Sequence, residues 1–166
     1  RRFAGAPGRL PLHGGGREGT LLAAIDRTAS SMGGRLLRQW LLRPLRNKAA
    51  IDARLDAVED LYQSVGMREA LGAALKGVHD LERILARTAC RSANARDLMA
   101  LRLTLERSAE ARQALGEARA EALARAAEAI DPHADLLETL ARGLGDEPPI
   151  SLREGGIIRD GFNAEL

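Results

Sequence analysis

The chain has 166 residues, a formal net charge of +2, and 45% hydrophobic and 29% charged residues, but only 2% aromatic residues. This composition suits one globular domain with a core of Leu, Ala, Ile and Val, a mixture that favours helices. No run of about 18 apolar residues is free of charge, and Arg1 and Arg2 lead into a Gly/Pro stretch instead of an apolar signal segment. These features argue against a membrane span and a secretory leader, and we expect a cytoplasmic protein.

Charge is distributed unevenly along the chain. Residues 1 to 54 contain 11 Lys and Arg against 3 Asp and Glu, whereas residues 55 to 166 contain 14 against 20. A basic end of this kind would allow contact with nucleic acid phosphates, because bound Lys and Arg release counterions. Aromatic side chains are not interleaved with these arginines, however, which favours the plainer interpretation of solvated faces and contacts to acidic groups within the domain.

The predicted elements follow a Gly-, Pro- and Arg-rich lead-in over residues 1–19, which we expect to be disordered. Thr20 precedes a short apolar helix that ends near Asp26. A second helix stops before Pro44, which cannot continue it, and its apolar positions are Met32, Leu36, Leu37, Trp40 and Leu41. Because Trp40 shares a face with aliphatic residues, we predict that it anchors the core and does not stack on bases.

Further helices are predicted as far as residue 145. The clearest amphipathic one carries Ile51, Leu55, Val58 and Tyr62 on one face. Shorter helices cover 67–76 and 80–90, Asn94 can cap the next, and a short stripe runs from Leu123 to Ile130. Asp131 and Pro132 then predict an N-cap with proline at the first helical position. The sequence therefore predicts an all-α fold, an irregular bundle of seven or eight helices over residues 20–145.

The pattern changes near the C-terminal end. Pro148 and Pro149 oppose a helix, and residues 150–152 alternate as a strand would. Gly155 and Gly156 are typical of a tight turn, with a return strand at residues 157–158, so we predict one small β-hairpin over residues 150–158. Asn163 is placed to cap a new helix over residues 163–166, and because this helix has scarcely begun we expect the chain to be a truncated segment.

The sequence lacks the residue patterns that are typical of catalytic, cofactor-binding and metal-binding sites. Residues 14–20 match the glycine spacing of a P-loop but lack its lysine. His13, His79 and His133 stand far apart in the sequence, and Cys90, the only cysteine, has no neighbouring histidine. No nucleophile is flanked by a base. We therefore assign no catalytic, cofactor-binding or metal-ligating residue to this chain and expect it not to be an enzyme as it stands.

Four stretches in one order resemble the core domain of the MutS family of DNA mismatch repair proteins. IDRTASSMGGRLLRQWLLRPL, residues 25–45, resembles its opening. GVHDLERILARTA, residues 77–89, and ARDLMAL, residues 95–101, resemble its middle, and DEPPISLREGGIIRDGFNAEL, residues 146–166, resembles its exit into a long lever helix. The resemblance spans roughly residues 17 to 166, so residues 20–166 are interpreted as a MutS-like core domain. Residues 3–16 depart from the family pattern.

The resemblance implies a parent protein larger than this chain. The family reads mismatched DNA with a Phe-x-Glu motif and hydrolyses ATP with Mg²⁺ in a P-loop domain, whereas here Phe3 and Phe162 lack the glutamate. The implied role is a scaffold that links mismatch-binding and connector domains to the lever, clamp and ATPase of a homodimer on double-stranded DNA. A free-standing helical adaptor for protein partners, a nucleotide-binding enzyme, and a MutS paralogue acting in recombination are the alternatives.

Overall fold

The computed structural model describes residues 20–145, 148–149 and 155–163, and over these residues the all-α prediction is confirmed. The predicted lead-in over residues 1–19 lies outside the described part. The elements are α1 (Leu21–Ile25), α2 (Ser31–Leu42), α3 (Lys48–Gln63), α4 (Val65–Lys76), α5 (Leu81–Ala89), α6 (Ala95–Ala114), the 3-10 turn η1 (Leu115–Glu117), α7 (Glu121–Ala129) and α8 (Ala134–Gly143).

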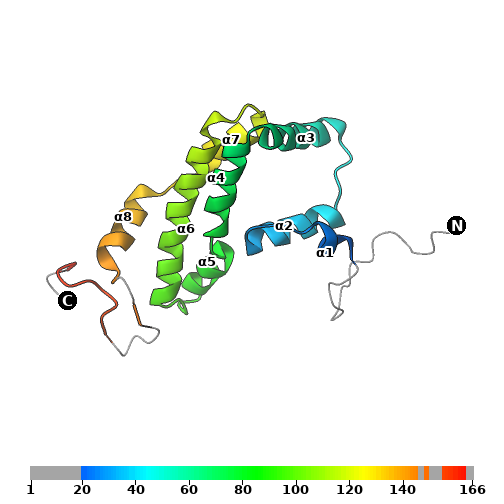
Figure 1. Cartoon of the computed structure of the whole chain (residues 1–166). Coiled ribbons are helices and arrows are strands. Elements are labelled where there is room, and N and C mark those ends of the chain that lie inside the picture. The colour runs from blue at the N-terminus through cyan, green and yellow to red at the C-terminus, as the bar shows by residue number, and fades with distance from the viewer. Residues whose placement is uncertain (1–19, 146–147, 150–154, 164–166) are drawn as a thin grey trace.

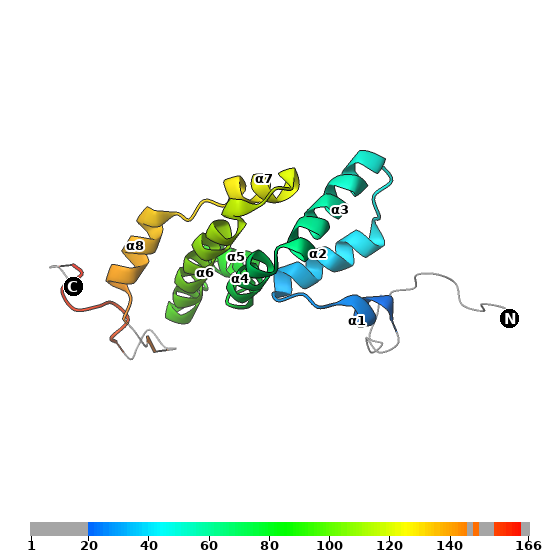
Figure 2. The ribbon, with the colours of Figure 1, turned by 45° about the horizontal axis from the view of Figure 1, so that its top comes forward.

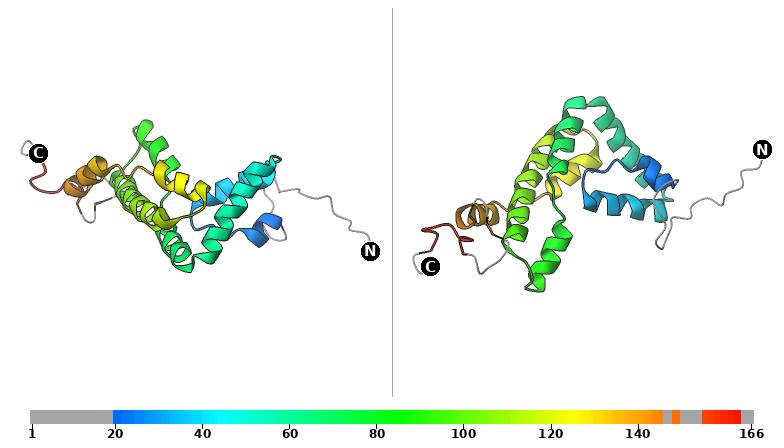
Figure 3. Two further views of the ribbon diagram at one scale, coloured as in Figure 1. Left: turned by 90° about the horizontal axis from the view of Figure 1, so that it is seen from above. Right: turned by 60° about the horizontal axis from the view of Figure 1, so that its bottom comes forward.

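The helices form an extended row. α4 and α6 lie side by side in the middle, α8 flanks α6, and α3 lies near α7 at one end of this pair (Figure 1). α1 and α2 stand on the side of the molecule opposite to α8 (Figure 2). The two views of Figure 3 show the same spread, with residues 155–163 and α1 at opposite ends. None of the helices in the described part has the length and apolar character that crossing a bilayer requires.

The hydrophobic core lies between α6 and α8. Leu105, Leu140 and Leu144 are buried together, and partly buried side chains pack around them from α6, α8 and residue 157: Leu98, Met99, Leu101, Leu137 and Ile157. Burial of one such leucine contributes about 1.5–3 kcal/mol. The C-terminal half of the chain therefore supplies most of the packed core.

Local capping sets the boundaries of α6 and α8. As predicted, Asn94 caps α6: its side chain accepts a hydrogen bond from the Asp97 amide (3.0 Å), and Asp97 accepts one from the Asn94 amide (2.9 Å). The predicted start of α8 was wrong by two residues. The Asp131 carboxylate accepts the His133 amide (2.9 Å) in a turn, so α8 begins at Ala134, after His133 in a left-handed conformation.

The predicted β-hairpin over residues 150–158 is not shown. Residues 150–154 lie outside the described part, and Ile158 instead forms an antiparallel bridge with Leu144 at the end of α8. The Gly145 amide donates to the Ile157 carbonyl (3.0 Å), and the Arg159 amide donates to the Gly143 carbonyl (2.8 Å). Residues 157–159 are thus tied to the end of α8. Residues 164–166, where the lever helix is expected, also lie outside the described residues.

Candidate functional site

A large apolar surface faces solvent on α2 and α3. Its members are spaced three or four residues apart along each helix and are between 42% and 78% exposed; we call Leu36, Trp40, Leu55, Val58 and Tyr62 the α2–α3 apolar surface. Single exposed apolar side chains are ordinary, whereas a row of them along one face of a helix marks a surface that a partner can cover. This surface is the main feature of the described chain that its own fold does not use.

Trp40 corrects the prediction of a core anchor. Its side chain is 42% exposed, and the Arg54 guanidinium lies 3.7 Å from the centre of its ring. The core lies between α6 and α8, away from α2 along the row of helices. α2 itself has no buried residue. The guanidinium stacked on one face of the ring stabilises the contact modestly and links α2 to α3.

Polar groups join α2 to the start of α5. Arg35 donates to both carboxylate oxygens of Asp80 (2.8 Å each) and to Glu82 (2.6 Å), and the Ser31 hydroxyl donates to Asp80 (3.3 Å). Hydrogen bonds from Arg35 lower the pKa of the Asp80 carboxyl to about 2 and raise that of the guanidinium further above its ordinary value. Asp80 also caps α5 by accepting the Arg83 amide (3.2 Å). One carboxylate therefore both caps a helix and holds α2 in place.

A cavity of about 700 Å³ adjoins this junction at the start of α2. Asp26 is the carboxylate among its lining residues, and Asp26 accepts hydrogen bonds from the amide (3.1 Å) and hydroxyl (2.7 Å) of Thr28. Ser30 caps α2 by accepting the Gly33 amide (3.1 Å). These hydrogen bonds shape the loop before α2.

Among the residues weighed from sequence as possible ligands, those that the structure describes do not come together. His79 precedes α5, with its amide donating to the Thr104 hydroxyl (3.1 Å), whereas His133 precedes α8. Cys90 is exposed at the end of α5. Within residues 20–145, 148–149 and 155–163, no three His, Cys, Asp or Glu side chains gather in a way that could hold a metal ion. His13 and the P-loop-like residues 14–19 lie outside the described part, while Thr20 caps α1.

Asp60 has a role that sequence reasoning missed. This α3 carboxylate is buried, and one of its oxygens accepts the backbone amides of Arg119 (2.6 Å) and Ala120 (2.8 Å) just before α7. It thereby satisfies donors at the start of a helix some sixty residues away in sequence. No local pattern around Asp60 distinguishes it from its exposed neighbours Asp56 and Glu59.

Comparison with known proteins shows which protein family this chain is similar to. The family model described as MutS domain III matches residues 9–165. Proteins described as DNA mismatch repair protein MutS are similar: that of Symbiobacterium thermophilum is 46% identical over 155 residues, which are 93% of this chain and 18% of the relative. Those of Desulforamulus reducens and Halothermothrix orenii are 44% and 41% identical over 155 residues, covering 93% of this chain and 18% and 17% of the relatives.

The chain thus spans less than a fifth of the length of the curated relatives that it matches. The family match covers every described helix, including the surface on α2 and α3, and also the bridge beside α8. The resemblance found in the four sequence stretches is confirmed, and the chain belongs to the MutS domain III family.

Proposed function

We propose that this segment is a mechanical link inside a MutS-type DNA mismatch repair protein. In this role it joins mismatch-binding and connector domains to the lever, the clamp and an ATPase domain of a homodimer on double-stranded DNA. ATP and Mg²⁺ would act in the parent protein and not in this segment. The observation that carries the proposal is the α2–α3 apolar surface, which is built for contact and not for chemistry.

Two further observations support a linking role. The packed core lies between α6 and α8, whereas α2 and α3 at the other side carry the more strongly exposed apolar side chains, which a partner would bury. The relatives are more than five times longer than the matched region, which supplies ample chain to cover that surface. We take the occupant to be another part of the same parent chain.

The test is a charge placed on the α2–α3 apolar surface. Val58 is 62% exposed here, so Val58→Glu in the 166-residue chain should change the free energy of unfolding by no more than about 0.5 kcal/mol. In the full-length parent the same glutamate would be buried, and an unpaired buried charge should lower the melting temperature sharply. Gln113→Glu is the matched control, because Gln113 is an exposed residue near the end of α6 and the change adds the same charge away from this surface.

Each result has a clear meaning. A large loss of stability in the parent, with little change in the short chain and little effect of Gln113→Glu, would support a buried interdomain contact. Equal melting temperatures for the parent with and without Val58→Glu would show that nothing covers α3 and would reject the proposal. Measurable mismatch preference or ATP hydrolysis by the 166-residue chain itself would also reject it, because the chain would then hold the chemistry assigned to other domains.

The junction after α8 provides a second test of linkage. Gly155 and Gly156 have φ of +72° and +67°, which other residues adopt only at a cost. Replacing both with Val in the parent should strain this turn by a few kcal/mol. We expect a weaker coupling between nucleotide state and DNA affinity, with ATP affinity in the absence of DNA nearly unchanged. The quantity to measure is the ratio of mismatch DNA affinities with and without ATP. If a folded variant keeps the ratio of the unaltered parent, the junction connects the domains without transmitting the nucleotide state.

A further inference from the structure

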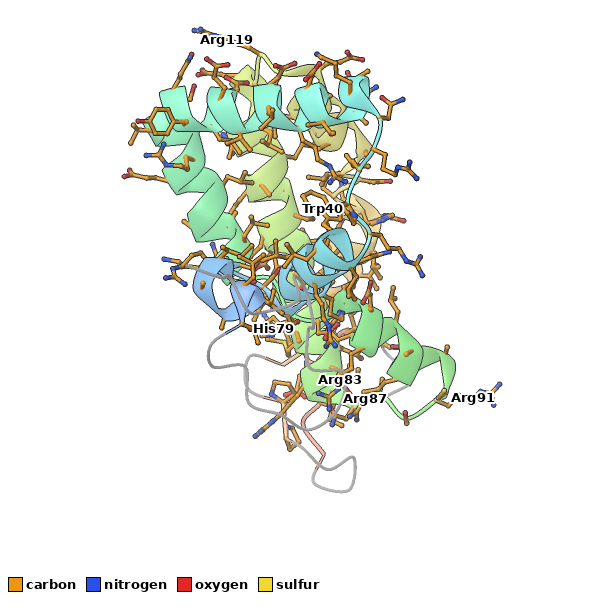
Figure 4. The ribbon with its side chains drawn as sticks, turned by 90° about the vertical axis from the view of Figure 1, so that its right-hand side faces the viewer. Trp40, His79, Arg83, Arg87, Arg91 and Arg119 are labelled. Carbon is orange, nitrogen blue, oxygen red and sulfur yellow. The ribbon has the colours of Figure 1, made fainter. Side chains whose placement is uncertain are left out.

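Three arginines follow one another at four-residue intervals along α5 and the turn after it. We call Arg83, Arg87 and Arg91 the α5 arginine ridge. Arg83 and Arg87 are four residues apart in α5, so they share a face and lie about 6 Å apart along its axis, whereas Arg91 lies in the turn after the helix. Figure 4 shows Arg83 and Arg87 next to each other on α5, and Arg91 at the tip of the α5–α6 turn, where it points away from the rest of the molecule.

Most arginines on the later helices have a glutamate partner one turn away, as in the pairs Arg102–Glu106, Arg125–Glu121 and Arg142–Glu138. The ridge differs. Arg87 is held by Asp97 (Nε–Oδ2 3.0 Å) and donates to the Ser92 carbonyl (2.9 Å). Arg83 and Arg91 are exposed and form no ion pair with any described residue. The carboxylates nearest in sequence to Arg83, those of Asp80 and Glu82, are both bound to Arg35.

Arg91 occupies a position that normally selects glycine. Its φ is +53°, in the left-handed region. The Ser92 amide donates to the Arg87 carbonyl (2.9 Å) and the Arg91 amide to the Thr88 carbonyl (3.0 Å), which is the hydrogen-bond pattern of a Schellman cap with Arg91 as its left-handed residue. Glycine adopts this conformation without a steric penalty, whereas a side chain opposes it. The stability of the fold therefore does not explain an arginine here.

Arg83 is also poorly placed for stability. It is the third residue of α5, in the first turn, where the partial positive charge of the helix end disfavours a cation. Glutamine or glutamate at this position could bond back to the amide of the capping residue Asp80 and complete a capping box. Like charges four residues apart, as in Arg83 and Arg87, oppose each other as well. A bound polyanion would remove each of these penalties that comes from charge.

We propose that the α5 arginine ridge binds the phosphate backbone of duplex DNA without reading its sequence. Arg83 and Arg91, the two exposed arginines of the ridge, stand near opposite ends of α5, and one DNA strand carries a phosphate every 3.4 Å of helix axis, so each can meet a separate phosphate of one strand. Guanidinium groups suit phosphate because they present paired donors. The choice of DNA among polyanions rests on the proposed function, since the relatives are DNA mismatch repair proteins.

The proposal predicts opposite effects on stability and on binding. Arg83→Gln and Arg91→Gly each remove one charge and one unfavourable feature of the fold. Each should raise the melting temperature of the 166-residue chain by a few °C. Each should also weaken binding to a short fluorescein-labelled duplex severalfold and reduce the slope of log affinity against log salt by about 0.9. Matched and mismatched duplexes should lose affinity equally.

Arg112→Gln is the matched control, because Arg112 is an exposed arginine in the last turn of α6 and its loss changes the net charge equally. An equal loss of affinity in this control would show a general charge effect and overturn the proposal. So would unchanged DNA affinity in both ridge variants, or ridge-dependent binding of a polyglutamate peptide in place of DNA. If Arg91→Gly fails to fold, the strain argument is wrong, and Arg83→Gln still tests binding. Failure here leaves the linking role intact, because Val58→Glu tests that role on another surface.

Discussion

Removal of the Asp60 carboxylate should weaken the contact between α3 and the start of α7. Asp60 is only 8% exposed, and its carboxylate accepts two backbone amides, from Arg119 at 2.6 Å and from Ala120 at 2.8 Å. Hydrogen bonds to a charged group contribute about 1.5–3 kcal/mol each, and a buried amide left without an acceptor carries a desolvation penalty. Asp60→Ala should therefore lower the free energy of unfolding by about 3 kcal/mol, which is the sum of the two hydrogen bonds at the lower end of their range.

Thermal and urea unfolding followed by circular dichroism measure this change. A loss of about 3 kcal/mol corresponds to about 6–12 °C in melting temperature for a chain of this size. Asp56→Ala is the matched control, because Asp56 is exposed on the same helix one turn earlier and should shift stability by no more than about 0.5 kcal/mol.

Hydrogen exchange gives a residue-specific check on the cause. In Asp60→Ala the amides of Arg119 and Ala120 should exchange faster than the loss of global stability alone explains. The exchange rates of amides in the middle of α6 should change only as much as the free energy of global unfolding does. Equal melting temperatures for the Asp60 and Asp56 variants would refute the reasoning. So would a large destabilisation in which the Arg119 and Ala120 amides stay as protected as before, because the lost energy would then have come from another contact.

Three further outcomes follow from the described contacts. Because bonding to Arg35 lowers the pKa of Asp80, the ionised Asp80 carboxylate should contribute fully to stability above about pH 4 and less as the pH falls toward 2. The difference in melting temperature between the unaltered chain and Asp80→Asn should therefore close over that range. A difference that does not depend on pH would contradict this. At Gly143 a Cβ would lie 3.1 Å from the Phe162 ring, so Gly143→Val should displace that ring and lower the melting temperature, whereas unchanged melting would show that the ring is free to move. Gly155→Ala should destabilise the chain by about 1 kcal/mol in urea titration because of its positive φ, and no loss would show that the turn relaxes.

Much of the fold follows from local chemistry that a sequence displays. Asn94 and Asp97 stand three residues apart and cap α6 as that spacing predicts, and Pro44 lies just beyond the end of α2. These contacts form within a few residues of each other, so the order of side chains is enough to predict them. The family could also be predicted, because four stretches kept their order and spacing over nearly the whole chain.

The start of α8 shows where local patterns have two solutions. Asp131 can cap a helix that begins at Pro132, or it can close a turn on the His133 amide, and both use the same carboxylate oxygen. The structure has the turn, with His133 left-handed before the helix. Both arrangements satisfy the same carboxylate, so the local sequence does not choose between them.

Only the tertiary structure decided which faces are buried and which distant groups meet. The spacing of Val58 and Tyr62 indicates an apolar face on α3 but does not say what covers it, and the fold leaves that face exposed. Ile158 pairs with Leu144, and Asp60 reaches the amide of Ala120, because the row of helices brings these segments together. Such contacts depend on how whole helices pack, whereas periodicity records only which side of a helix is apolar.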